Sequence, residues 1–252
     1  STGFAMPVIS RTMGWRAGLW MTALVSLIAL AGLRLITEIA GSRRSPQSGE
    51  AGGSSASRPS GDAGLPRFVY HVAIYGFLMG LIGGGLGRFL PLFAEESVGL
   101  TPEMAGRVFG VQGLVAIPTR ILSGILLDRG MSARRTLIVM GAGGAGAVAL
   151  ILASTDGSEA FLWIGTILAG LTLGSWNTAA NLAMIRERRG AGRASGVLIF
   201  GFLAGLTLGG PIVGRSIDTF DSYSPAWAGS AILALIATAV VTRRPREAAL
   251  YP

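Results

Sequence analysis

The chain contains no cysteine, no lysine and a single histidine, and only 13 of its 252 residues are acidic. The absence of cysteine excludes disulfides and thiolate metal sites. The sequence also lacks an H-E-x-x-H motif, a nucleophile elbow and a Walker sequence, and no pair of carboxylates falls within an apolar run. We therefore expect neither an enzyme nor a bound metal or cofactor.

Long apolar runs dominate the rest of the sequence. They cover residues 15–36, 68–93, 104–127, 136–153, 161–185, 195–213 and 225–241. Each is close to the roughly 20 residues that a helix needs to cross a bilayer. The runs lack the alternation of barrel strands, and only helices or closed barrels satisfy the backbone in lipid. The sequence predicts an all-α integral membrane protein with seven transmembrane helices, for which the lipid bilayer is a partner.

Arginines mark alternate connections between these runs. Of the 21 basic residues, 15 lie in or beside one set of connections, namely Arg34, Arg43, Arg44, Arg58, Arg67, Arg129, Arg134, Arg135, Arg186, Arg188, Arg189, Arg193, Arg243, Arg244 and Arg246. The opposite loops hold acidic residues instead, namely Glu95, Glu96, Glu103, Asp156, Glu159, Asp218 and Asp221. Positively charged loops face the cytoplasm. We therefore expect a multi-pass protein of the cell (inner or plasma) membrane, with its amino terminus outside and its carboxyl terminus inside.

The net charge of +8 does not indicate a nucleic-acid partner. A nucleic-acid-binding domain gathers its basic residues on one face, together with aromatic side chains. Here the arginines are dispersed over loops at the membrane edge. We expect no binding of nucleic acid.

Composition divides the chain into four parts. An outer stub and one helix occupy 1–36, and a linker rich in glycine, serine and proline follows at 37–67. Such a composition favours a flexible cytoplasmic segment. Six helices form a bundle over 68–242, and 243–252 is a cytoplasmic tail. Because the chain begins without methionine, at what resembles the outer end of an earlier helix, we expect a fragment that lacks its first helices.

Three segments resemble signature segments of major facilitator superfamily transporters. They are the G-W-R that opens the sixth helix (Gly14, Trp15 and Arg16), the G-x-x-x-D-R-x-G-R-R loop between helices eight and nine (Gly124, Asp128, Arg129, Arg134 and Arg135), and the G-P-x-x-G-x-x-x-D segment of helix eleven (Gly210, Pro211, Gly214 and Asp218). One helix, a long linker and six further helices are also similar to the second part of such a transporter.

The resemblance implies the carboxy-terminal half of a secondary transporter, together with the sixth helix. It implies alternating access, in which two bundles rock about a central site for a small-molecule solute. The missing amino-terminal half would be a partner of this chain, and Asp128 and Arg129 would belong to a cytoplasmic gate. An organic or inorganic anion permease fits, and a drug or sugar exporter of the same superfamily is an alternative. A receptor or scaffold on the same bundle is another.

Glycines recur within the apolar runs. Residues 136–146 match the G-x-G-x-x-G of a dinucleotide site, but that site needs a soluble β-α-β unit, so we interpret these glycines as helix packing. Small residues at spacing four allow helix backbones to approach closely. We expect two such ridges to pack helices, formed by Gly76, Gly80, Gly84, Gly201, Gly205 and Gly209. The run 83–87 can also break the second helix.

Polar groups inside the apolar runs are candidates for a solute cavity, because they are costly in lipid. Gln112 and Arg120 share one face of the third span, and we expect Arg120 to be structural and to anchor the loop that follows. On the fifth span Asn177 and Asn181 fall on one stripe with Thr166, at helical spacing. Each of these groups lines a cavity or makes hydrogen bonds between helices.

Arg88 lies inside the second span, where no acidic residue in any span can neutralise it. A buried arginine is expected to pair with an anion. Its partner is either Glu95 or Glu96 across the turn, or an anionic substrate. The substrate-binding candidates are therefore Arg88, Gln112, Asn177 and Asn181.

Overall fold

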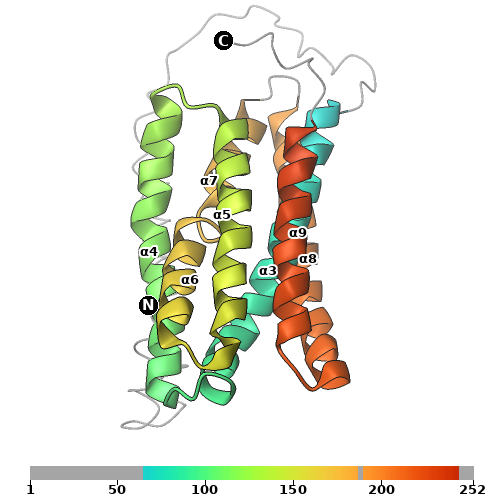
Figure 1. Cartoon of the computed structure of the whole chain (residues 1–252). Helices are drawn as coiled ribbons and strands as arrows, with labels where there is room; N and C mark the ends of the chain where they lie inside the picture. Colours follow the sequence, from blue (N-terminus) through green and yellow to red (C-terminus); the bar gives the residue numbers. More distant parts are fainter. Residues whose placement is uncertain (1–64, 187–189, 244–252) are drawn as a thin grey trace, which may run out of the picture. The chain divides into compact units, whose positions relative to one another are not determined.

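The computed structural model describes residues 65–186 and 190–243, which form helices joined by short turns and contain no strand. The helices are α3 (Arg67–Glu96), α4 (Pro102–Asp128), α5 (Ala133–Ala153), η1 (Ser154–Asp156), α6 (Glu159–Leu171), α7 (Trp176–Ile185), α8 (Ala191–Phe220) and α9 (Ser224–Thr242) (Figure 1). They give 6 candidate membrane spans, α6 and α7 together forming one. The predicted all-helical membrane fold is confirmed. The predicted first span, linker residues 37–64 and tail residues 244–252 lie outside the described residues.

Short polar residues and glycine set the helix ends. The Thr101 hydroxyl accepts a hydrogen bond from the backbone N–H of Met104 at 3.4 Å and begins α4. The Ser132 hydroxyl does the same for Arg135 at 3.2 Å and begins α5. These contacts satisfy N–H groups that a helix start leaves without a partner. Gly130 has a φ of 96°, in the left-handed region that favours glycine after a helix end. The turn between α4 and α5 is therefore encoded locally.

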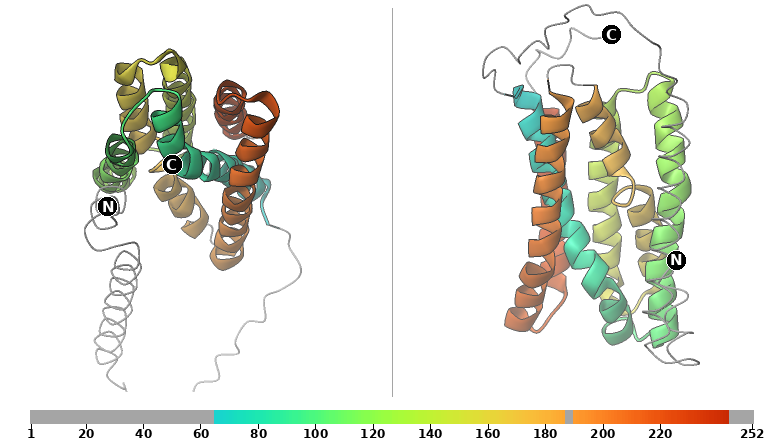
Figure 2. Two further views of the ribbon diagram at one scale, coloured as in Figure 1. Left: turned by 90° about the horizontal axis from the view of Figure 1, so that it is seen from below. Right: turned by 180° about the vertical axis from the view of Figure 1, so that it is seen from behind.

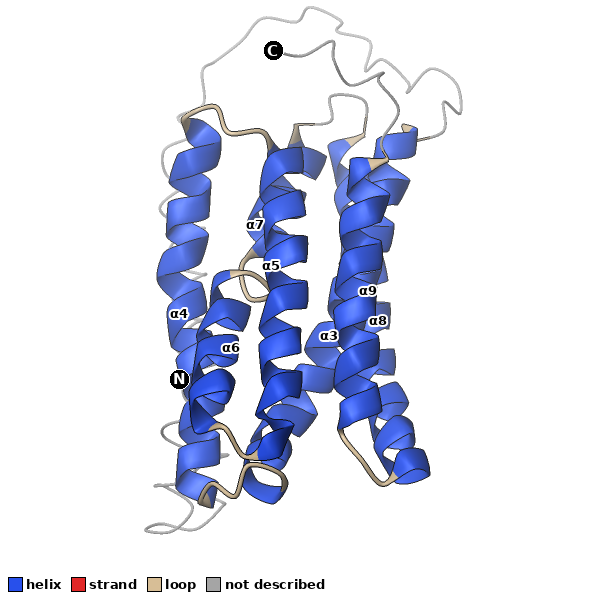
Figure 3. Cartoon of the chain, in the orientation of Figure 1, coloured by secondary structure: helices blue, strands red, loops and turns tan. Residues whose placement is uncertain are grey.

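Two spans differ from their prediction. The expected break at 83–87 is wrong, because α3 continues through these glycines to Glu96. In lipid an intact helix satisfies its own backbone, and glycine alone does not interrupt it. The break lies instead in the fifth span, where α6 ends at Leu171 and α7 begins at Trp176. Figure 3 shows the intervening turn in tan.

The two predicted glycine ridges meet between α3 and α8, which run parallel. A methyl group added at Gly205 would overlap the carbonyl oxygen of Phe77, and one at Gly80 would overlap the carbonyl oxygen of Phe202. Gly209 similarly abuts the Leu81 carbonyl. The two backbones are therefore so close that only hydrogen fits between them, which is how helices associate without a hydrophobic force in lipid.

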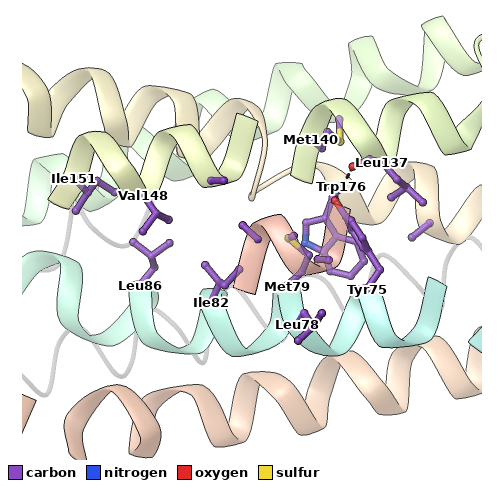
Figure 4. Packing of buried hydrophobic residues seen from close by; sticks show 14 of the residues in the cluster. Tyr75, Leu78, Met79, Ile82, Leu86, Leu137, Met140, Val148, Ile151 and Trp176 are labelled. Carbon is purple, nitrogen blue, oxygen red and sulfur yellow. Dashed lines mark hydrogen bonds between the residues drawn. The ribbon is translucent and has the colours of Figure 1, made fainter. Parts of the chain in front are cut away.

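The opposite side of α3 faces α5 and α7 (Figure 4). Leu86 lies opposite Val148 of α5, and the ring of Tyr75 packs edge-to-face on Trp176 of α7 with centroids 5.6 Å apart. The Tyr75 hydroxyl donates to the carbonyl oxygen of Leu137 at 3.0 Å. α3 thus lies between α8 and the α5–α7 side of the bundle (Figure 2), and α5 also packs directly on α9.

Tyr223 attaches the turn between α8 and α9 to the end of α3. Its hydroxyl donates to the Glu96 carboxylate at 2.5 Å, and its ring packs on Phe93 and Trp227. Burial, followed by the hydrogen bond to Glu96 and the charge of that carboxylate, raises the pKa of Tyr223. The hydroxyl therefore stays protonated near neutral pH and continues to donate.

The connections alternate between the two ends of the bundle (Figures 1 and 2). Since arginine-rich ends face the cytoplasm, a single cysteine introduced at 43–58 or 188–193 should be shielded from impermeant thiol reagents in intact cells. A cysteine at 95–99 or 156–159 should react. The cysteine-free chain supplies the unlabelled background. Labelling of the opposite set would reverse the orientation.

Candidate functional site

The break in the fifth span lies against α4. Gly170 and Gly174 leave no room for a side chain, because a methyl group at Gly170 would lie 2.6 Å from the carbonyl oxygen of Gln112 and one at Gly174 would lie 2.7 Å from the Ala116 Cβ. The Ser175 hydroxyl lies within hydrogen-bond distance of the Gly170 carbonyl at 3.2 Å. Polar contacts of this kind are what irregular backbone requires inside a membrane.

Arg120 of α4 also stabilises the break, through a hydrogen bond to its backbone. Its Nε donates to the carbonyl oxygen of Gly174 at 2.8 Å. The expectation that Arg120 is structural fits this contact, but its partner is the α6–α7 break and not the loop after α4. The two terminal nitrogens of the guanidinium make no hydrogen bond to the described residues. They are available to a ligand, since arginine presents its donors as a planar fork.

A cavity of about 220 Å³ lies between α3, α4 and the break. Gly83 and Gly87 of α3 line one wall, Gln112 and Arg120 of α4 line another, and Gly174 belongs to the break. Gln112 and Arg120 supply its polar side chains, and no carboxylate lines it. The glycines on α3 make the space, because a side chain at Gly87 would meet nothing within 4 Å and would enter open volume.

The Oε1 atom of Gln112, a side chain that lines this cavity, is buried without a hydrogen-bond partner in the part of the chain that the structure describes. The same holds for Oγ1 of Thr166 on α6, which does not line the cavity. A buried acceptor that lacks a donor costs about 1–3 kcal/mol. Such a group needs a donor from a bound water or from a ligand.

Arg88 does not line this cavity. Its side chain crosses Gly210 of α8, where an added methyl group would lie 2.7 Å from its Cδ and from Nη1. Neither of the two possible ion pairs, with Glu95 or with Glu96, is present in the described residues, and Glu96 instead accepts the hydrogen bond from Tyr223. Arg88 is exposed. Its chain neighbour Gly87 lies in the cavity wall.

Asn177 and Asn181 both lie on α7, after the break. Asn177 is half-buried and Asn181 is exposed, whereas Thr166 is buried on α6. The predicted single stripe is therefore wrong, because the turn at 172–175 changes the helical phase between the two segments. Neither asparagine lines the cavity of Gln112 and Arg120.

The predicted gate segment forms the turn between α4 and α5. Gly124 and Asp128 belong to the last turns of α4, and Arg129 caps it. The Arg134 guanidinium donates from Nε to the carbonyl oxygen of Val241 at 3.2 Å and from Nη2 to that of Thr242 at 2.5 Å. These bonds satisfy carbonyls at the end of α9. The Arg135 side chain is exposed.

Sequence reasoning missed both the break and the partner of Arg120. The signal for the break was present as Thr172, Gly174 and Ser175 within four residues of an otherwise apolar run. Glycine lets the chain leave the helix, and hydroxyl groups provide local hydrogen bonds that compete with it. The role of Gly210 was also missed, since its lack of a side chain is what lets Arg88 lie on α8.

The chain matches the family model of the Major Facilitator Superfamily over residues 2–198. This range includes α3 to α7 and the first part of α8, and therefore both walls of the cavity. A comparison with curated proteins gives no match. A helical membrane bundle and a family match that extends over most of the sequence point the same way, and the chain belongs to the Major Facilitator Superfamily.

Proposed function

We propose that this chain is part of a secondary transporter that carries a small anion across the cell membrane by alternating access. The family supports a multi-pass membrane transporter. In such proteins the solute binds between two bundles that rock against each other. The bundle at 68–242 would be one of these, and an amino-terminal half joined through the linker at 37–67 would be the other.

The main support for an anionic solute is that two arginines lack an ion-pair partner among the described residues. Arg88 and Arg120 each lie about two turns inside the end of their helix. Neither forms an ion pair with a described residue, and no carboxylate lines the cavity beside Arg120. A guanidinium inside a membrane is stabilised by an anion, and its fork fits carboxylate or phosphate oxygens. A cationic solute would add to the charge instead of balancing it.

We assign Gln112 to the cavity with Arg120, and Arg88 to its approach on the α8 side. Asn177 and Asn181 would contribute from α7 in a conformation that brings this helix to the solute. Asp128, Arg129, Arg134 and Arg135 would form the cytoplasmic turn that closes the path. A drug or sugar exporter and a non-transporting receptor or scaffold are the competing functions.

Solute-dependent stability tests the proposal on the complete transporter in detergent. We expect one or more small carboxylates, phosphate or sulfate to raise the unfolding midpoint, since a ligand that binds only the folded state stabilises it by mass action. Choline, tetraphenylphosphonium and uncharged sugars at the same concentration and ionic strength should not. The stabilising anion should then accumulate in proteoliposomes. Stabilisation by a cation or sugar alone would contradict the proposal, and binding without uptake would favour the receptor.

A further inference from the structure

The side chains that line the cavity beside the α6–α7 break define its ligand more closely than a preference for negative charge. Its two polar side chains, Gln112 and Arg120, come from one helix and offer opposite chemistry. The guanidinium provides hydrogen-bond donors and a positive charge, and the Gln112 Oε1 provides an acceptor. A ligand that satisfies both groups must therefore carry an anionic acceptor and a separate donor.

The anionic end is positioned by the break. Because Arg120 already donates its Nε to the Gly174 carbonyl at 2.8 Å, the guanidinium is held in place before a ligand arrives. Its free edge presents the two terminal nitrogens, which match the two oxygens of a carboxylate. A donor group fixed in advance loses less freedom on binding than a mobile one.

The other end is the buried Oε1 of Gln112, which lacks a donor among the described residues. A ligand hydroxyl or ammonium can supply one. An ammonium is disfavoured here, because the nearby arginine repels it and no carboxylate lines the cavity to stabilise it. A hydroxyl carries no charge, and it can also accept a hydrogen bond if the amide turns over. A hydroxyl is therefore the donor that best fits the Gln112 side chain.

The spacing of the two groups limits the size of the ligand. An α-helical side chain leans toward the start of its helix, and Arg120 reaches Gly174, which contacts Ala116. The guanidinium therefore lies near the level of Ala116, about 6 Å along the helix from the Cα of Gln112, and the Gln112 amide leans further toward the helix start. A molecule of three to five carbons, with a hydrogen bond at each end, spans this distance.

We propose that this cavity binds a small hydroxycarboxylate, with its carboxylate on the terminal nitrogens of Arg120 and its hydroxyl on the Gln112 side chain. The inference rests on the proposed function, since it names the class of anion that the transporter would carry. It also gives the break a role, because Gly174 orients the arginine that binds the carboxylate.

Matched acid pairs test this on the complete transporter, through dissociation constants measured by ligand-induced thermal stabilisation. The pairs are lactate with propionate, and 3-hydroxybutyrate and 4-hydroxybutyrate with butyrate. We expect at least one hydroxy acid to bind about tenfold more tightly than its parent, because the parent leaves Oε1 without a donor. Gln112→Leu keeps the side-chain size and should reduce this preference to about twofold or less, while the parent acid binds as before.

Thr119→Val is the matched control, since the Thr119 hydroxyl on the same helix bonds to the Val115 carbonyl and does not line the cavity. It should keep the tenfold preference. Equal binding of both members of every pair, or a preference that survives Gln112→Leu, overturns the hydroxycarboxylate while the anion transporter stands. Failure of every carboxylate, phosphate and sulfate to bind overturns the proposed function together with this inference.

Discussion

Replacing Gly205 by leucine is expected to prevent α3 and α8 from packing and to remove most of the folded protein. Even the Cβ of alanine would overlap the carbonyl oxygen of Phe77, a backbone atom that cannot turn away as a side chain can. Overpacking costs typically 1–3 kcal/mol and occasionally more, and the gain from replacing a helical glycine is only about 0.5–1 kcal/mol. Alanine should therefore destabilise the protein by about 1–2 kcal/mol, and leucine should destabilise it further.

Gly196→Ala is the matched control. Gly196 lies on the same helix, is exposed, and would place its added methyl group in open space. It should leave the unfolding midpoint unchanged or raise it slightly. The test compares the three variants with the wild type in detergent. It measures the unfolding midpoint and the monodisperse fraction of each. If Gly205→Leu unfolds at the wild-type midpoint, the close contact between α3 and α8 is wrong.

Substitution of Arg88 is expected to weaken transport in the order arginine, lysine, alanine. Lysine keeps the charge but loses the planar fork, and alanine loses both. A hydrogen bond to a charged group contributes about 1.5–3 kcal/mol, so Arg88→Ala should raise the half-saturation concentration for the transported anion about 10- to 100-fold. Initial uptake rates over a range of anion concentrations, in proteoliposomes of the complete transporter, give this quantity.

Arg107→Ala controls for the loss of a positive charge on the same bundle. Arg107 lies near the start of α4, where its Nη1 contacts the Met104 sulfur at 3.6 Å, and it does not line the cavity. Its replacement should change the half-saturation concentration less than twofold. Normal transport by correctly inserted Arg88→Ala would mean that Arg88 does not contribute to anion binding.

The sequence was sufficient for the positions of the described spans and for the glycine ridges on α3 and α8, because both depend on regular patterns. Length and hydropathy define a span, and spacing four places Gly80 and Gly84 on one side of α3. The structure puts this side against Gly205 and Gly209 of α8. That pairing joins segments far apart in the chain, and no pattern within either segment specifies its partner.

The cavity was less accessible to sequence reasoning. Gln112 was a candidate and lines it, but Arg120 was assigned to the wrong partner, and the predicted stripe through Thr166 and Asn177 is interrupted. Both errors have one cause, the treatment of the fifth span as a regular helix. The turn at Gly174 exposes a carbonyl that Arg120 can reach and changes the phase of every residue after it. Helical spacing describes side-chain positions only as far as the helix remains unbroken.

The contact between α3 and α8 also constrains how the protein is made. About 120 residues and the intervening spans separate Gly84 from Gly205, and ribosomes add about 5–20 residues per second. For on the order of 10 s, nascent α3 must therefore wait in the bilayer with its glycine face uncovered by the segment that finally occupies it. During this interval lipid, another glycine-rich helix of the same chain or the insertion machinery must cover that face. The small residues that let the finished helices pack therefore also create a requirement during biogenesis.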